Sequence, residues 1–144
     1  MKKIEVAMMI AKEVHKDDRY GDKVYFDYHL MNVYGRAIEL VDGEKEKEIV
    51  GIVAILHDIV EDHGYDVGMI VKLFGKKVAD AVVAMSFDKD NESREEYYER
   101  VLKNEIAKIV KIADASENRW NCEKDGDMKR FAYYDKIVKM MGGV

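Results

Sequence analysis

Apolar residues recur at helical spacing through nearly the whole chain, and no proline interrupts them. The spacing is clearest at three groups of positions: Ile4, Met8 and Val14; Leu30, Val33 and Ile38; and Ile52, Leu56 and Ile59. Apolar side chains three or four residues apart lie on one face of a helix and can be buried together. We therefore predict an all-α fold of about seven or eight helices.

Polar residues at the expected helix ends agree with this prediction. Asp27 and Asp66 are suited to cap helix starts, Ser93 and Glu96 have the spacing of a capping box, and glycines 64 and 75 suit helix exits. The stretch VADAVVAMSF, residues 78 to 87, is rich in β-branched valine, which favours a strand as the alternative. Its helical neighbours favour a helix.

The length of 144 residues fits one compact domain, residues 1–144. The formal net charge of -5 disfavours a nucleic-acid polymer as a partner and favours a small ligand. No apolar run is long enough to span a membrane, and we read the lysine-led first 16 residues as a helix because charged residues interrupt them. Cys122 is the only cysteine, so no intrachain disulfide forms, and we expect a cytoplasmic protein.

The stretch AILHDIVEDHGYD, residues 54 to 66, is unusual for an apolar helix. Within six residues it carries a histidine and three carboxylates, namely His57, Asp58, Glu61 and Asp62. A continuous helix, turning about 100° per residue, points all four to one side and the isoleucines to the other. The small residues Gly51 and Ala54 share the polar side. We therefore expect open space for a ligand above that face.

The ordinary explanation for a charged stripe is a solvated helix face. Such a face normally mixes long lysine and glutamate side chains, whereas this one combines short aspartates with a histidine and has no basic residue within one turn. Three carboxylates this close repel one another unless water or a cation compensates. The pattern therefore favours a divalent metal site, with the solvated face as the alternative.

Two other segments carry the side chains that would complete a metal site. His29 lies among apolar neighbours near the start of an amphipathic helix. Asp114 interrupts an apolar run, with Lys111 and Asn118 one turn away on the same face. Taken singly, His29 is as well explained by a hydrogen-bonded core histidine, and Asp114 by an ion pair with Lys111. Their joint occurrence with the pair at 57 and 58 favours metal ligation.

The order of these motifs resembles the HD-domain superfamily of metal-dependent phosphohydrolases. ILHDIVED (55 to 62) and VKIADASEN (110 to 118) are similar to the motifs of RelA/SpoT-type alarmone hydrolase domains and their small single-domain relatives. SFDKD (86 to 90) is similar to a T-x-D-K loop of that family, and LFGKKVADAV (73 to 82) to its phenylalanine-glycine turn and following helix. The resemblance covers about residues 5 to 121.

The resemblance implies a role for each matching residue. One divalent metal, commonly manganese, would be held by His29, His57, Asp58 and Asp114, although zinc and iron remain alternatives. Glu61 and Asp62 match the catalytic acidic pair. Asn118 matches a nucleotide-contacting asparagine, and Lys111 and Lys89 are weaker matches near the pocket. Apart from the resemblance, Lys23, Lys111 and Arg119 are candidates to neutralise the remaining phosphate charge.

Departures from the family pattern concern the substrate more than the metal. The segment VHKDDR (14 to 19) lacks the arginine and glutamine of the family's K-H-R-G-Q motif, and FDYHL (26 to 30) lacks both prolines of P-Y-x-x-H-P. Ala115 stands where lysine is usual. We expect intact metal chemistry and leave the base of the nucleotide open.

The sequence therefore predicts a metal-dependent hydrolase that removes pyrophosphate from the 3′ position of guanosine tetra- or pentaphosphate. One alternative is an HD-type nucleotidase with another nucleotide substrate. The other is a non-catalytic module that binds a metal or nucleotide for regulation. The acidic pair Glu61 and Asp62 favours an enzyme, because metal binding alone does not require it. The sequence does not indicate an oligomeric state.

Overall fold

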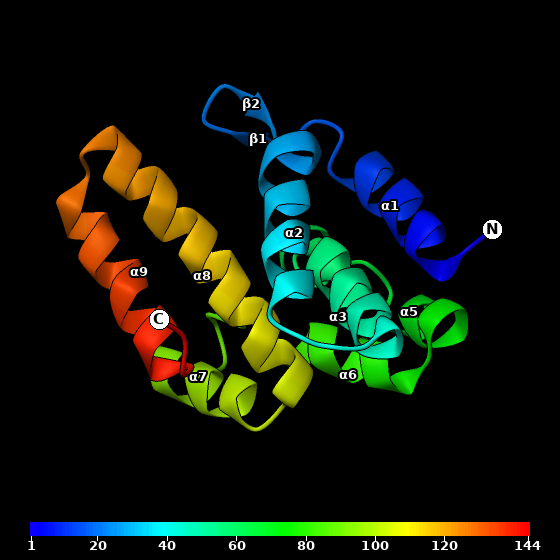
Figure 1. Cartoon of the computed structure of the whole chain (residues 1–144). Coiled ribbons are helices and arrows are strands. Elements are labelled where there is room, and N and C mark those ends of the chain that lie inside the picture. The colour runs from blue at the N-terminus through cyan, green and yellow to red at the C-terminus, as the bar shows by residue number, and fades with distance from the viewer.

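The computed structural model describes all 144 residues as nine α-helices, one short π-helix and a two-stranded hairpin (Figure 1). The α-helices are α1 (Lys3–Val14), α2 (Met31–Glu39), α3 (Glu44–Leu56), α4 (Ile59–His63), α5 (Val67–Phe74), α6 (Lys76–Ala84), α7 (Arg94–Leu102), α8 (Glu105–Asp125) and α9 (Met128–Met140). The π-helix η1 (Phe26–Leu30) leads directly into α2. Strands β1 (Arg19–Tyr20) and β2 (Lys23–Val24) pair antiparallel. The prediction of an all-α fold is confirmed.

The helices enclose one hydrophobic core. In Figure 1, α8 and α9 run side by side, α2 and α3 lie at the centre, and α1 and α5 lie beyond them. The core is one cluster of 30 buried residues, from Ala7 in α1 to Met141 after α9. Burying each large apolar side chain contributes about 1.5–3 kcal/mol to folding. The helices that carry the polar motifs are therefore held by shared packing, which fixes where those motifs meet.

The helix ends follow local sequence at most of the predicted positions. Asp66 caps α5 by accepting the Gly68 N–H at 2.9 Å, and Ser93 forms a capping box with Glu96. Of residues 78 to 87, where a strand was the alternative, residues 78 to 84 belong to α6. The prediction that Asp27 caps a helix is wrong, because this residue lies inside η1, whose preceding residue is already helical.

The segment around the His-Asp pair is two helices and not one. α3 ends at Leu56 and α4 begins at Ile59, so His57 and Asp58 occupy the turn between them. His57 Nδ1 lies 2.7 Å from the carbonyl oxygen of Ala54, which in a continuous helix would accept the Asp58 N–H. The imidazole thus replaces a helical bond and breaks the helix at the motif. This break divides one predicted helix into α3 and the five-residue α4.

The expected space above Gly51 and Ala54 is also absent. Both residues are buried. A Cβ atom at Gly51 would lie 2.7 Å from the Tyr34 ring, closer than any real contact. The small residues therefore serve the close approach of α2 and α3, and the ligand space lies elsewhere.

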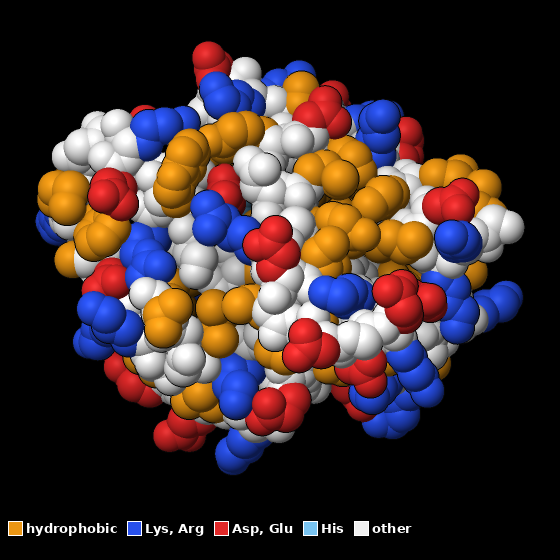
Figure 2. Space-filling view, viewed as in Figure 1, with side chains coloured by type: hydrophobic (Ala, Val, Ile, Leu, Met, Phe, Trp, Pro, Cys, Tyr) orange, Lys and Arg blue, Asp and Glu red, His pale blue; other side chains and the backbone are white.

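The helices and the charged surface agree with the predictions made from apolar runs and net charge. No helix combines the length and the apolar character needed to cross a bilayer. Figure 2 shows lysine and arginine interspersed with aspartate and glutamate on the face seen in Figure 1. That face offers no continuous basic surface of the kind that follows a nucleic-acid backbone.

Candidate active site

Four predicted metal ligands converge from three parts of the chain. His29 comes from η1, His57 and Asp58 from the turn between α3 and α4, and Asp114 from the middle of α8. His29 Nε2 lies 2.9 Å from Asp114 Oδ1, and His57 Nε2 lies 3.6 Å from the same oxygen. Asp58 Oδ2 lies 3.2 Å from His57 Nε2. The side chains of the two histidines are almost completely buried, and those of the aspartates are mostly buried.

The protonation of His57 shows whether a cation fits between these groups. Its Nδ1 donates to the Ala54 carbonyl oxygen, so Nε2 of the neutral ring carries a lone pair. That Nε2 is buried without a hydrogen-bond partner and faces the carboxylates of Asp58 and Asp114. Beside two carboxylates this nitrogen carries a positive charge as its partner: a proton in the metal-free site, which the raised pKa of His57 reflects, or a metal ion that replaces this proton. Donor atoms of His29, His57 and Asp114 all lie within 4.8 Å of one another, so the site fits a divalent ion.

The pKa values of the carboxylates agree with a ligand role. Burial alone raises the pKa of Asp58, but the charge and hydrogen bond of His57 outweigh it and lower the pKa to about 2. Burial likewise opposes the ionised form of Asp114, whose pKa is lowered well below its usual value by bonds to His29 and His57. Burial lowers the pKa of His57, yet the two aspartates outweigh it and raise that pKa. The protein thus keeps negative charge in a buried position, ready for a cation.

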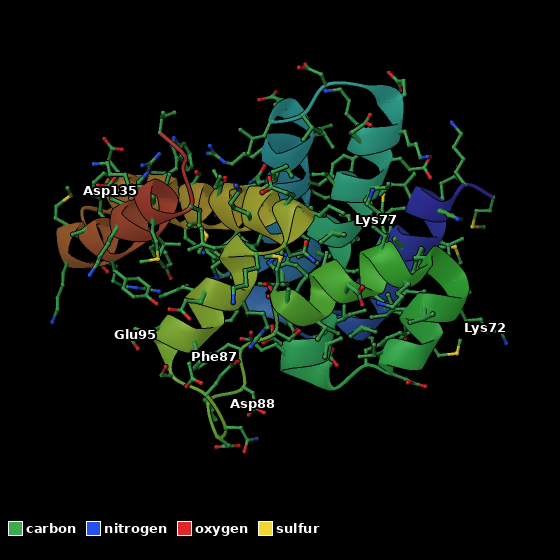
Figure 3. All side chains as sticks on the ribbon, turned by 90° about the horizontal axis from the view of Figure 1, so that it is seen from below. Lys72, Lys77, Phe87, Asp88, Glu95 and Asp135 are labelled. Atoms are coloured by element: carbon green, nitrogen blue, oxygen red, sulfur yellow. The ribbon has the colours of Figure 1, made fainter.

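The acidic pair on α4 lies at the edge of this cluster. Glu61 lines a cavity of about 180 Å³ together with His57, Asp58 and Asp114. The backbone N–H of Phe87, on the loop labelled in Figure 3, donates to Glu61 Oε1 at 2.7 Å. Asp62 lines an adjoining hollow of about 640 Å³, which Glu61 also borders. Glu61 therefore stands between the two spaces.

Both carboxyl groups of this pair hold protons more tightly than usual. Burial raises the pKa of Glu61, partly offset by the Phe87 N–H. Burial and the negative charge of Asp58 raise the pKa of Asp62 to about 6. A carboxyl group whose pKa approaches neutrality is suited to proton transfer.

The structure separates the predicted substrate-binding residues into three places. Lys111 and Asn118 line the smaller cavity, where Lys111 Nζ lies 3.6 Å from Asp114 Oδ2. Lys89 lines the larger hollow. Lys23 lies in a different groove, where its ammonium group stands over the Tyr28 ring. The structure therefore brings Lys111 and Asn118 to the metal ligands, Lys89 close by, and Lys23 to neither space.

Burial of Lys111 does not neutralise it. Burial alone lowers the pKa of this lysine, but Tyr97 and Asp114 outweigh the effect and raise it. Arg119 was the third basic residue predicted to neutralise phosphate charge. Its guanidinium instead donates to Asp135 at 2.8 Å and links α8 to α9.

Sequence reasoning missed several residues of this site. The Tyr25 hydroxyl donates to Asp58 Oδ2, and the Tyr20 hydroxyl donates to Asn118 Oδ1 at 2.9 Å. The Tyr20 ring is stacked on His29, with centroids 5.1 Å apart. Arg94 borders both spaces, and its guanidinium stands 3.9 Å over the Phe87 ring. Only the density of tyrosines near His29 hinted at these roles, and helically spaced aromatics are more often core residues.

Comparison with known proteins places this arrangement in a family. Residues 26–119 match the model of the HD domain, and the chain belongs to the HD domain family. This range contains all four candidate ligands and both residues of the acidic pair. HD domains bind divalent metals, which agrees with the cluster of His29, His57 and Asp114.

A solved structure shares the fold. It is described as "A metazoan ortholog of SpoT hydrolyzes ppGpp and plays a role in starvation responses" and is similar with a TM-score of 0.79 and 24% sequence identity. The match covers 99% of this chain and 87% of that chain. A comparison with curated protein sequences gives no significant match. Family and fold together support a metal-dependent phosphohydrolase.

Proposed function

We propose that this protein is a metal-dependent pyrophosphohydrolase that removes the 3′-pyrophosphate of guanosine tetra- or pentaphosphate. The observation that carries the proposal is the convergence of the buried His57 Nε2 on the carboxylates of Asp58 and Asp114, beside a cavity lined by Glu61 and Lys111. A cation site, an acid–base group and a positive charge are the three parts that hydrolysis of a phosphate ester requires. A cytoplasmic location is part of the proposal, since Cys122 is a free thiol.

His29, His57, Asp58 and Asp114 would hold one divalent ion. Such an ion supplies Lewis acidity toward a phosphate oxygen and lowers the pKa of water. Manganese suits a mixed imidazole and carboxylate set, and zinc and iron are included in the test below. Tyr25 orients the carboxylate of Asp58 by donating to its Oδ2.

Glu61 is the proposed base for the attacking water. The Phe87 N–H holds Oε1, so Oε2 is free to accept a proton from water in the cavity. Asp62 follows on the same helix and faces the adjoining hollow. The proton taken from water then passes through this pair to the departing 3′ oxygen, which leaves as a hydroxyl.

Three side chains are placed to bind phosphate. Lys111 projects into the smaller cavity as a charged group, and Arg94 stands at the border of both spaces. Asn118 is oriented by the Tyr20 hydroxyl, which occupies its carbonyl oxygen and turns its amide N–H groups toward Asp114 and the cavity. We propose that the scissile pyrophosphate lies in the smaller cavity and that Lys89 meets the substrate in the larger hollow.

The nucleotide is proposed from the fold and from the motifs. The structure similar to this chain belongs to a protein described as hydrolysing ppGpp. The departures at residues 14 to 19 favour a second candidate, a nucleotidase of the same family that acts on another nucleotide. The proposed pyrophosphohydrolase releases pyrophosphate, whereas the nucleotidase releases orthophosphate.

A nucleotide panel separates these activities. The purified chain is incubated with manganese, zinc or iron(II) and with guanosine tetraphosphate, guanosine pentaphosphate and the nucleoside mono-, di- and triphosphates. Pyrophosphate released from the 3′-substituted nucleotides supports the proposal. Orthophosphate released from a monophosphate supports the nucleotidase. No product with any metal supports a binding module and refutes both hydrolases.

The role of Glu61 is tested by Glu61→Gln. Loss of a general base lowers kcat by roughly 10²–10⁴-fold, whereas metal affinity should stay nearly unchanged because Glu61 is not a ligand. The matched control is Glu99→Gln, an exposed glutamate on α7 outside both spaces. Turnover that survives Glu61→Gln at the level of this control would remove Glu61 from the mechanism.

A further inference from the structure

A second cluster of metal-binding side chains lies outside the HD residues. It consists of His15 after α1, Asp18 in the following turn and His63 at the end of α4. Asp18 Oδ2 lies 2.7 Å from His15 Nδ1 and 2.6 Å from His63 Nε2. The three donor atoms all lie within 4.8 Å of one another. His15 is fully buried, and the other two side chains are each 33% exposed.

The donor set is that of a transition-metal site. Two imidazole nitrogens and one carboxylate oxygen are the protein ligands of many zinc sites, with bonds of about 2.0–2.2 Å. A tetrahedral ion with such bonds separates neighbouring donor atoms by roughly 3.3–3.5 Å. Donor atoms that lie 2.6 and 2.7 Å apart need to separate by less than about 1 Å to admit it. One coordination position then remains for water or a fourth side chain.

The surroundings of the cluster favour a cation. Two of the three ligands, Asp18 and His63, line an open hollow of about 400 Å³, together with Asp17, Arg19, Tyr25 and Asp62. Three of these side chains are carboxylates, and the guanidinium of Arg19 is turned to the carbonyl oxygens of Lys16 and Asp18. Burial lowers the pKa of His15, so its imidazole is neutral and able to ligate.

The cluster joins the two segments that frame the active site. His15 and Asp18 precede the hairpin, whose Tyr20 is stacked on His29 and bonded to Asn118. His63 ends α4, which has five residues and carries Glu61 and Asp62. The Tyr25 ring stands between the two clusters, with its centroid 5.0 Å from that of His15 and 5.1 Å from that of His29. A bond across the second cluster would therefore fix the acidic pair relative to the hairpin.

We propose that His15, Asp18 and His63 form a second divalent metal site, of the zinc type, which clamps α4 to the segment following α1. This site is separate from the HD ligands, so it stands or falls independently of the proposed hydrolase. Its role is to position Glu61 and Asp62, and it takes no part in binding phosphate.

The test is the zinc stoichiometry of the full-length chain. The unmodified chain should bind two equivalents of zinc, measured by atomic emission after equilibrium dialysis. His63→Gln and Asp18→Asn should each bind one, because loss of a direct ligand weakens binding by at least roughly 100-fold. Asp17→Asn, the matched control in the same hollow, should keep two equivalents and lose at most roughly fivefold in affinity. Asp114→Asn should lose the HD equivalent and keep the second.

The absorption spectrum of bound cobalt tests the second site directly, without a variant of its own ligands that could fail to fold. Cobalt bound to Asp114→Asn should give the visible absorption of a tetrahedral nitrogen and oxygen site, and zinc should displace it. One equivalent of zinc in the unmodified chain, lost on Asp114→Asn, would overturn the proposal. Two equivalents retained by folded His63→Gln would overturn it equally.

Discussion

The buried Glu117 makes a quantitative prediction about how α2 and α8 are held together. Its side chain is 3% exposed, and Oε1 accepts the Arg36 Nε–H at 2.8 Å. Oε2 accepts Nδ2 donors from Asn121 at 2.9 Å and from Asn32 at 3.3 Å. α8 carries Asp114, and α2 continues directly from the π-helix that carries His29. Glu117 therefore sets the separation of two candidate ligands.

The expected cost of Glu117→Ala follows from these contacts. Breaking a buried ion pair by removing one partner costs about 3–5 kcal/mol when the other charge stays buried. The side chain of Arg36 is 38% exposed, so water recovers part of its lost bond. The two asparagine amides lose an acceptor, at about 1 kcal/mol each or less. We expect the free energy of unfolding to fall by about 2–4 kcal/mol.

The assay is urea unfolding of the metal-free chain at pH 7, with Glu123→Ala as the matched control. Glu123 is an exposed glutamate on the same helix, and its loss should change the free energy of unfolding by less than about 0.5 kcal/mol. The metal affinity of Glu117→Ala should also weaken, because α2 and α8 lose their buried link. A loss of stability below about 1 kcal/mol would show that packing alone holds the two helices.

Two further predictions concern the loop beside Glu61 and the contact of α2 with α3. Glu92 pairs with Arg100, whose guanidinium lowers the pKa of Glu92 below 4.5, so Glu92→Gln should lower the melting temperature at pH 7. The ion pair stabilises the fold only while Glu92 is ionised, so the difference in melting temperature between Glu92→Gln and the unmodified chain should vanish as the pH falls through the pKa of Glu92 in the folded chain. A difference in melting temperature that does not change with pH would contradict the pairing. Gly51→Ala should destabilise the chain by roughly 1–2 kcal/mol in thermal unfolding, because contact with Tyr34 exceeds the gain in helix propensity. The matched control is Gly35→Ala on α2, where an added Cβ atom meets nothing within 4 Å, so this variant should gain stability from helix propensity. A stabilised Gly51→Ala would refute the packing argument.

Part of the local structure could be predicted from the sequence. The helical period of the apolar residues predicted the fold class, and the caps at Asp66 and Ser93 form as predicted. The break at His57 was not predicted, because it depends on a side chain taking the Ala54 carbonyl oxygen from the helix. The hairpin was also missed, since strands of two residues are too short to leave a periodic pattern.

Residue types in the motifs indicated a metal, but their arrangement depended on packing. His29 and Asp114 are 85 positions apart and approach to 2.9 Å only because α2 and α8 pack together. Tertiary packing also brings Tyr25 to Asp58 and Arg94 to the cavity, roles that the motifs did not indicate. The ligand roles themselves remain proposals, for which metal binding is the test.

The sequence by itself determined an all-helical chain and the donor types available to it, because helix period and capping depend on residues a few positions apart. The tertiary structure decided which donors meet, which nitrogen of His57 stays free and where open space remains. It also brings His15, Asp18 and His63 into a second cluster, which no local sequence pattern predicts. Proximity across the fold results from the packing of whole helices, and a single sequence records that packing only indirectly.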